Sequence, residues 1–364
     1  MVAAALALPG VAPAQTGPGP ALVGVRVLNY HDWQPGLDRI RVNSPALILQ
    51  TPVGDRWGVE TALTTDSVSG ASPRYHSAVS GASRMHDRRR AGDLRITRYD
   101  ERSSWSLGMA GSNENDFRSR ALSAQGSWST PDNNRTWTAG IGHRLDRIGS
   151  VNAPALDERR RTLELAAGVT QALSRRDLIQ FGITHANGHG YYSDPYKLPD
   201  LRPDSRRQTS ATVRWHHHLE GWDTTLRASY RLYGDSFGIR SHTATLEPVV
   251  ALAPGVTLAP SVRLYSQGAA SFYYNPVRAY SGVPTPPGYF DGPPVPLSAD
   301  QRLSAFGALT IGLRLAVEFG DGWQADIRIE RYEQRSAWHL RGQGSRGIDP
   351  FSASFVQWGL VRRF

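Results

Sequence analysis

The sequence predicts an all-β protein: a single transmembrane, antiparallel up-and-down β-barrel of about 16 strands, within a range of about 14 to 18. Three observations carry this prediction. Stretches of about ten residues alternate apolar and polar side chains, each stretch is closed by Gly, Asp, Asn or Pro, and short and long connections follow one another alternately. Helical periodicity is almost absent.

The alternation is clearest at residues 302–319. Leu309, Ile311 and Leu313 fall on one face there, and Arg314 and Glu318 fall on the other. Sixteen segments of this kind are expected, centred near residues 22–32, 39–51, 56–67, 91–99, 103–113, 117–129, 135–146, 160–173, 177–188, 208–219, 223–234, 239–252, 255–267, 302–319, 322–334 and 353–364.

The connections between the segments separate into two sets. One set is short, with sequences such as "PVGD", "DERS", "SRRD" and "GDGW". The other set holds every long excursion, at residues 68–90, 147–159, 189–207, 268–301 and 335–352. Short periplasmic turns and long extracellular loops are typical of outer-membrane barrels, and an even strand number places both termini on the periplasmic side.

The last segment ends at Phe364, and an uncovered alternating strand would be an unprotected sheet edge. A closed barrel removes the edge by pairing residues 355–364 with residues 22–31. A terminal strand that ends in Phe also resembles the signal read by the barrel-assembly machinery, so we assign Phe364 as an assembly signal.

Composition narrows the classes further. The net charge is +9 and the mean hydropathy is −0.41. Lys197 is the only lysine, and there is no cysteine, which excludes disulfides and cysteine-based metal or thiol sites. The arginines are scattered instead of clustered, so no nucleic-acid partner is expected. We interpret residues 1–14 as the remnant of a signal peptide that ends in a small-x-small cleavage pattern, and residues 15–364 as the barrel.

Two features speak for other structures. A soluble β-sandwich or propeller would also show the alternation, although it would not separate short from long connections. Pro248 and Pro260 fall inside predicted strands, where proline cannot donate to the ladder.

The polar face of the strands predicts the content of the lumen. A wetted wall with charges of both signs would orient passing solutes, whereas for each residue alone we favour the interpretation as a solvated lumen side chain. The lumen and selectivity candidates are Arg118, Arg120, Glu164, Arg227, Arg231, Glu247, Arg263, Arg314, Glu318, Asp326, Arg328 and Glu330.

Two loops are long enough to close such a pore, at residues 68–90 and 268–301, and the sequence does not decide whether they fold inward. Five tryptophans near the short turns are expected to form an aromatic girdle at the headgroup level. They are Trp57, Trp105, Trp128, Trp137 and Trp323.

Candidate chemistry is weak. His216, His217 and His218 are consecutive, so on a strand they point to alternating faces and do not converge on a metal. His185 and His189 near Asp194 could form a metal or acid–base cluster, although such a grouping is more often a loop cap. No nucleotide or metalloprotease motif is present, so we expect no catalytic residues, cofactor or metal, and no enzyme.

Several stretches together resemble a known family. They include "DSVSGASPRYH", "NGHGYYSDPYK", "RPDSRRQTSATVRWHHHL" and "GDSFGIRSHTATLEP", and they span nearly the whole chain after residue 14. The sequence is similar to the bacterial outer-membrane barrels of the domain-of-unknown-function family 3570 (DUF3570). The resemblance implies a Gram-negative outer membrane and supplies no catalytic residues. It also implies a partner role beside small lipoproteins or redox proteins.

These observations predict a porin-like channel for small polar or anionic solutes in the cell outer membrane. The alternative is an occluded barrel that acts as a scaffold for a periplasmic or surface partner, including a redox lipoprotein. The expected contacts are outer-membrane lipid, the barrel-assembly machinery and that partner protein.

Overall fold

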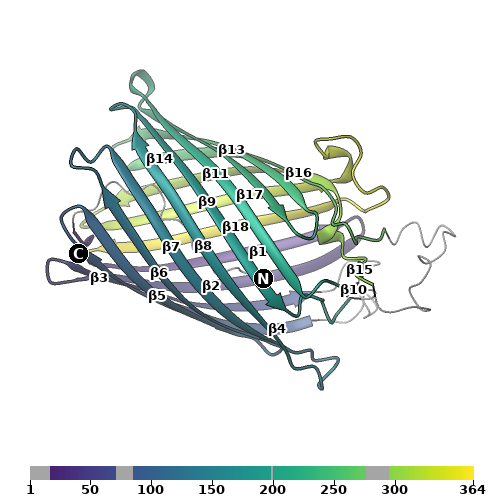
Figure 1. Ribbon diagram of the computed structural model, residues 1–364. Helices are drawn as coiled ribbons and strands as arrows, with labels where there is room; N and C mark the ends of the chain where they lie inside the picture. The colour runs from purple at the N-terminus through teal and green to yellow at the C-terminus, as the bar shows by residue number, and fades with distance from the viewer. Residues whose placement is uncertain (1–16, 71–84, 198–199, 276–294) are drawn as a thin grey trace.

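The structure is a computed structural model that describes residues 17–70, 85–197, 200–275 and 295–364. Sixteen strands close into one antiparallel barrel, with every strand hydrogen-bonded to its sequence neighbours and β1 bonded to β18 (Figure 1). The predicted fold class is therefore confirmed. The predicted signal remnant, residues 1–14, lies outside the described residues.

The barrel strands are 11 to 17 residues long. They are β1 (Leu22–Gln34), β2 (Leu37–Val53), β3 (Trp57–Gly70), β4 (Met85–Tyr99), β5 (Ser103–Asn113), β6 (Phe117–Ser129), β7 (Arg135–Ile148), β8 (Glu158–Ala172), β9 (Asp177–Gly190), β11 (Ser205–Leu219), β12 (Thr224–Asp235), β13 (Arg240–Ala253), β14 (Val256–Gln267), β16 (Phe306–Phe319), β17 (Trp323–Arg335) and β18 (Phe351–Arg363).

The two ends of the barrel differ as the connection lengths predict. Every connection in the predicted short set lies at one end, which we call the short-turn end; it also holds the start of β1 and the end of β18. The tightest turn at this end is Pro254–Gly255, where Gly255 has a φ of +76° that suits a two-residue hairpin. The other end, the long-loop end, carries the connections at residues 191–204, 268–305 and 336–350.

The terminal strands close the barrel as predicted. β1 pairs with β18 from Leu22↔Arg363 to Trp33↔Ser352, and the Phe364 amide donates to the Ala21 carbonyl at 2.9 Å. No edge strand is left in the barrel sheet, so its backbone groups are satisfied within the wall.

The two strand prolines lie at one place. Pairing between β13 and β14 is interrupted between Leu246↔Val262 and Val250↔Leu258, and continued register would set Pro248 opposite Pro260. Each proline keeps its pairing with the outer neighbour, β12 or β16. Because the two missing donors face one another, the ladder loses hydrogen bonds at a single point instead of two.

Two further strands, β10 (Asp200–Leu201) and β15 (Leu297–Ser298), form a separate pair at the long-loop end. Three single-turn 3-10 helices, η1 (Glu220–Trp222), η2 (Gln301–Leu303) and η3 (Ser336–Trp338), sit in the connections. Among the described residues, no helix is long and apolar enough to span a bilayer.

Candidate functional site: the lumen and its closure

Strand register decides which face of the wall each side chain occupies. Directly paired residues of antiparallel strands share a face, so the row Leu94, Met109 and Leu122 runs along the outer surface, with Met109 56% and Leu122 64% exposed. The opposite face carries Tyr233 and Gln267, which contact loops folded into the opening. The apolar face is therefore the outer one.

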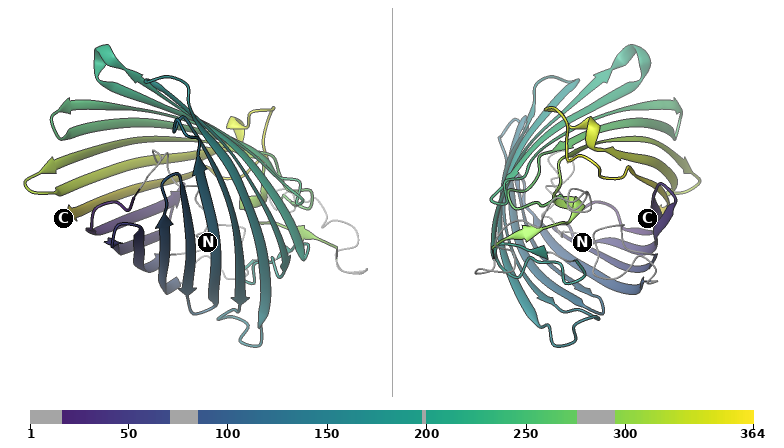
Figure 2. Two further views of the ribbon diagram at one scale, coloured as in Figure 1. Left: turned by 60° about the vertical axis from the view of Figure 1, so that its left-hand side comes forward. Right: turned by 90° about the vertical axis from the view of Figure 1, so that its right-hand side faces the viewer.

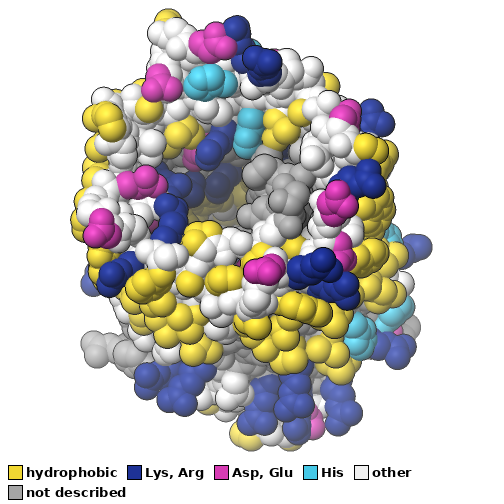
Figure 3. Space-filling view, turned by 90° about the vertical axis from the view of Figure 1, so that its left-hand side faces the viewer, with side chains coloured by type: hydrophobic (Ala, Val, Ile, Leu, Met, Phe, Trp, Pro, Cys, Tyr) yellow, Lys and Arg dark blue, Asp and Glu magenta, His cyan; other side chains and the backbone are white. Residues whose placement is uncertain are grey.

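This register places ten of the twelve predicted lumen residues on the inner face. They are Glu164, Arg227, Arg231, Glu247, Arg263, Arg314, Glu318, Asp326, Arg328 and Glu330. Figure 3, seen from the short-turn end, shows a hollow whose wall carries Lys or Arg and His side chains.

Arg118 and Arg120 differ from the prediction, because they lie on the outer face. Both have the parity of Leu122 and Trp128, and Arg120 pairs across the strands with Leu145, which is 53% exposed. The inner parity of β6 holds Ser119, an alanine and further small polar residues. Neither face of β6 is strongly apolar near its start, so alternation alone could not orient the two arginines.

The tryptophans follow the prediction. Trp57, Trp105, Trp128 and Trp137 are outward and 42 to 55% exposed, and Trp323 lies on the same face of β17. All five lie next to short turns. Trp105 and Trp128 stack with ring centroids 6.4 Å apart. The set forms a belt at the short-turn end, as an interfacial aromatic girdle requires.

Three inward arginines form a cluster without carboxylate partners, the lumen arginine cluster: Arg214, Arg231 and Arg263. Arg214 and Arg263 lie in one cross-strand row through β11 to β14, and Arg231 is two residues along β12 on the same face. At about 4.8 Å per strand the row is about 14 Å wide. Arg214 donates to Gln180 at 2.9 Å, Arg231 lies 5.6 Å from the Tyr233 ring, and no described carboxylate reaches ion-pair distance of the three.

Several other inward arginines are compensated. Arg227 lies 3.4 Å from Glu247 on the next strand, and Arg314 lies 3.6 Å from Asp326. Three further candidates join the same pattern, with Arg328 bonded to Glu330 at 2.6 Å and Glu318 3.3 Å from Arg363. These pairs reduce the net charge of the wall toward the short-turn end. Among the described residues, the inward arginines without a carboxylate partner are those of the lumen arginine cluster and Arg26 of β1.

The wall opposite the lumen arginine cluster, formed by β5 and β6, carries uncharged, mostly small side chains on its inner face. β5 is eight positions from β14 in the strand order, halfway round the barrel. The inner positions of β5 and β6 carry no charged side chain: Ser104, Ser106, Gly108, Ala110, Ser112, Ser119, Ala121, Ser123, Gln125 and Ser127. The lumen therefore has one cationic wall opposite one neutral wall, an arrangement that sets up a transverse field.

The long-loop end is partly closed by two loops, residues 191–204 and 268–305, whose described parts we call the plug. Figure 2 (right), which looks at this end, shows residues 295–305, in light green, within the outline of the barrel. Its apolar centre packs Phe272, Leu303 and Ala270 against Phe237 and Ile239 of the β12–β13 turn. Phe237 is 1% exposed and contacts the Phe272 ring edge-on at 5.0 Å.

An ion cluster joins the two loops. Asp300, which is fully buried, accepts from Arg302 at 2.6 Å and from Arg202 of the other loop at 2.8 Å, and Lys197 lies 3.9 Å away. Burial alone raises the pKa of Asp300, but the surrounding Arg302, Lys197 and Arg202 outweigh it and hold the pKa well below its usual range. Burial lowers the pKa of Lys197, against the attraction of Asp300.

The plug is fastened to the inner wall. Gln267, at the end of β14, donates to the carbonyls of Arg302 and Ser304 at 2.9 and 2.7 Å. Arg206 of β11 bonds Asp235 and lies 4.5 Å from the Phe237 ring. The plug is therefore part of the folded wall at its base and not a free loop.

Buried aspartates brace the inner wall near the same end. Each lies at the end of a strand and has an arginine partner: Asp32 with Arg39, Asp66 with Arg89, Asp146 with Arg160, and Asp235 with Arg206. Buried carboxylates require such partners, so we interpret these pairs as structural.

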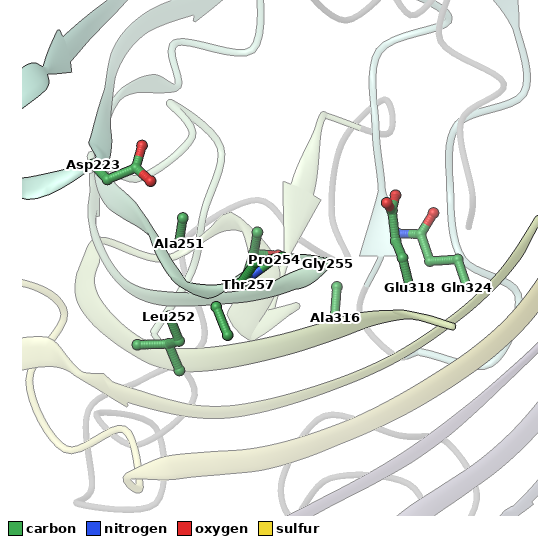
Figure 4. Close-up of a pocket in the computed structure, with 10 residues that line it drawn as sticks. Asp223, Ala251, Leu252, Pro254, Gly255, Thr257, Ala316, Glu318 and Gln324 are labelled. Atoms are coloured by element: carbon green, nitrogen blue, oxygen red, sulfur yellow. The ribbon is translucent and has the colours of Figure 1, made fainter. Parts of the chain in front are cut away.

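A shallow cavity of about 480 Å³ lies at the short-turn end. Figure 4 shows Ala251, Gly255, Thr257 and Ala316 along its floor, with Glu318 at one side. Its floor residues are small and uncharged, and Glu318 is engaged by Arg363. Besides Thr257, its polar lining side chains are Asp223, Glu318 and Gln324. Arg363 bonds both Glu318 and Gln324, so we interpret the cavity as a depression at the end of the lumen.

The histidines do not assemble. His216 faces the lumen, whereas His217 faces outward, bonds Asp177 at 2.8 Å and stacks on Trp215. His185 bonds Thr209 at 2.9 Å on the outer face. Asp194 bonds Arg302 in the plug. Among the described residues no group of three or more His, Asp or Glu side chains is arranged to hold a metal.

The prediction omitted Arg214 and the plug ion cluster. Arg214 could have been found, because it has the parity of His216 on a strand that was predicted. The cluster could not, because Arg202 and Asp300 are 98 residues apart and belong to loops without periodicity.

The closed sixteen-stranded wall, its apolar outer band and its aromatic belt define an outer-membrane type β-barrel. Within that class, the chain belongs to the family described as "Protein of unknown function (DUF3570)", whose model matches residues 77–156 and 150–355. The resemblance in sequence is thus confirmed. No curated protein matches the sequence.

Two solved structures share the fold, and a third has a lower similarity that carries no conclusion. A "Bacterial polysaccharide outer membrane secretin" is 10% identical with a TM-score of 0.51, over 94% of this chain and 98% of that one. CdiB from Acinetobacter baumannii is 9% identical with a TM-score of 0.50, over 93% of this chain and 60% of that one. OccD3 (OpdP) from Pseudomonas aeruginosa has a TM-score of 0.45 at 8% identity, over 95% and 91%. At such identities the likeness concerns the fold alone.

Proposed function

We propose that this barrel is a passive outer-membrane channel for small anionic solutes, narrowed at its extracellular mouth by the plug. In this orientation the short-turn end faces the periplasm and the long-loop end faces outward. The lumen arginine cluster carries the proposal, because three guanidinium groups on a wetted wall lack described carboxylate partners.

The chemistry of the wall favours anions for a physical reason. Arginine stays charged at all relevant pH and its planar fork matches carboxylate and phosphate oxygens. The neutral wall of β5 and β6 offers no competing negative charge. An anion that enters the lumen therefore meets an attractive potential on one side only, which selects charge without binding the solute tightly.

The test is the ion selectivity of the refolded chain in a planar bilayer under a salt gradient. We expect steady conductance with anion preference, and a loss of that preference in the triple variant Arg214→Gln, Arg231→Gln, Arg263→Gln. The matched control is the double variant Arg328→Gln, Glu330→Gln, which removes an ion pair from the lumen wall and leaves its net charge unchanged. An unchanged reversal potential in the triple variant would refute the selectivity role.

The alternative, an occluded barrel that docks a periplasmic or surface protein, is favoured by one observation: the described plug is a packed, ion-paired unit. A correctly folded barrel that conducts no ions, even after the plug is loosened, would support the alternative. Crosslinking in intact cells would then identify the partner.

A further inference from the structure

We propose that an arginine patch on the outer wall binds the phosphate groups of a phosphorylated glycolipid in the outer leaflet. The outer arginine patch consists of Arg90, Arg118, Arg120, Arg159 and Arg161, on β4, β6 and β8. The inference depends on the outer-membrane placement of the barrel and is independent of the channel function.

The register brings these arginines together. Arg90 pairs with Asn113, Asn113 with Arg118, Arg118 with Arg147, and Arg147 with Arg159. One step nearer the short-turn end, Leu145 is flanked by Arg120 and Arg161 in the next outward row. Two adjacent rows of guanidinium groups therefore share one face across five neighbouring strands, β4 to β8.

The charge of this patch is largely uncompensated. Arg118, Arg147 and Arg159 lie directly opposite one another on neighbouring strands. Like charges in such positions destabilise a sheet. Asp157 engages Arg147 through two hydrogen bonds of 2.5 and 2.8 Å. No described carboxylate lies within ion-pair distance of the five patch arginines, so an external anion is the missing counter-charge.

The patch lies at the depth where phosphates are found. Trp128 and Trp137 mark the interface at the short-turn end, and Arg118 and Arg147 are ten positions further along the same strands. At about 3.4 Å per residue and a tilt of about 40°, ten residues rise about 26 Å, and Arg120 rises about 21 Å. The apolar band of such barrels is about 25 Å tall, which places the arginines at the opposite headgroup level.

Phosphate is the anion that fits best. Arginine binds phosphate through paired, charge-assisted hydrogen bonds. The acyl chains of a membrane lipid pack against the barrel wall and so keep its phosphate groups beside the arginines. Elsewhere on the outer face near the long-loop end, Arg331 and Arg335 both bond Glu333, and Arg41 bonds Asp38. Those sites have their counter-charge within the protein and provide a natural control.

The experiment is native mass spectrometry of the refolded full chain titrated with bisphosphorylated lipid A or its dephosphorylated form. The test variant is Arg118→Gln, Arg120→Gln, Arg159→Gln, Arg161→Gln, and the control is Arg331→Gln, Arg335→Gln. Folding of each is checked by heat-dependent gel migration. We expect the test variant to bind the bisphosphorylated lipid at least about ten-fold more weakly than wild type.

The control variant should bind the bisphosphorylated lipid as wild type does. The dephosphorylated lipid should bind wild type and the test variant equally weakly. Equal affinities of the test variant and wild type for the bisphosphorylated lipid would overturn the proposal, as would equal binding of the two lipids to wild type. Anion selectivity should be retained in the test variant, so failure here is distinguishable from failure of the channel proposal.

Discussion

The plug and the lumen wall use the same residue type under opposite conditions. In the plug, Arg202 and Arg302 converge on the fully buried Asp300. On the wall, Arg231 and Arg263 are exposed to the lumen and have no described carboxylate partner. Arginines of both kinds lie inside the barrel. Their position inside it therefore does not decide their role.

The difference is one of solvent. A buried charge without a partner is strongly destabilising, so the fully buried Asp300 requires the plug arginines. Arg202, which is 7% exposed, and Arg302, which is 49% exposed, hold the two loops together through it. A charge on a wetted wall is solvated at little expense and remains available to a passing ion. From this comparison we infer that the ion-paired arginines stabilise the fold and that the unpaired arginines of the lumen determine ion selectivity.

The largest effect is expected from removing the carboxylate of the plug. Asp300→Ala removes the common partner of Arg202, Arg302 and Lys197. Because Arg202 keeps Asp200 and Arg302 keeps Asp194, the plug is expected to be destabilised by about 3 kcal/mol. We expect higher conductance and faster proteolysis within residues 268–305, with heat-dependent gel migration of the barrel unchanged. Asp157→Ala, which removes an exposed loop pair with Arg147, is the control. Wild-type conductance and protease resistance in Asp300→Ala would break the comparison.

A charge reversal on the wall should have the next largest effect. Arg263→Glu changes the local charge by two units, and each unit is worth about 1 kcal/mol at 4 Å in water, so the anion-to-cation permeability ratio should fall about five-fold or more. The reversal potential in a salt gradient measures this. Arg331→Glu, on the outer face, should leave the potential where it is. A shift in reversal potential of equal size in both variants would show that ion selectivity does not depend on the charge at the lumen position.

Removing a wall carboxylate should sharpen the selectivity slightly. Glu247→Gln releases Arg227 from an ion pair of 3.4 Å whose arginine is 45% exposed. Such a pair contributes less than about 1 kcal/mol, so anion preference should rise by less than about five-fold. The measurement is again the reversal potential. A fall in anion preference would contradict the proposed role of the cationic wall.

The smallest effect is expected from mild acid. Asp300 has a folded-state pKa held below its usual value of about 4, so its contribution to stability is complete above about pH 4 and is lost only as the pH falls further, through the folded value. Conductance should therefore stay constant from about pH 8 to about pH 5. An opening transition within that window would show that Asp300 is not the group that holds the plug.

The features that the sequence predicted are those that depend on local patterns of residues. Strand number, connection lengths and the β1–β18 closure were foreseen because alternation and turn residues are local and the closed sheet must satisfy its own backbone. The register places ten of the lumen candidates on the inner face, as alternation suggests, and their role in selectivity stays a prediction. It places Arg118 and Arg120 on the outer face, because strands extend beyond the apolar band, where polar side chains are tolerated on both faces.

The closed antiparallel wall, its two unlike ends and its aromatic belt are encoded in the amino-acid pattern, because they depend on a period of two and on local turn chemistry. The meeting of Arg202 with Asp300, 98 residues apart, and the alignment of Arg214 with Arg263 across two intervening strands are visible only in the folded chain. So is the outward orientation of Arg118. Contacts between loops and across strands depend on register and on three-dimensional burial, and a one-dimensional pattern encodes neither.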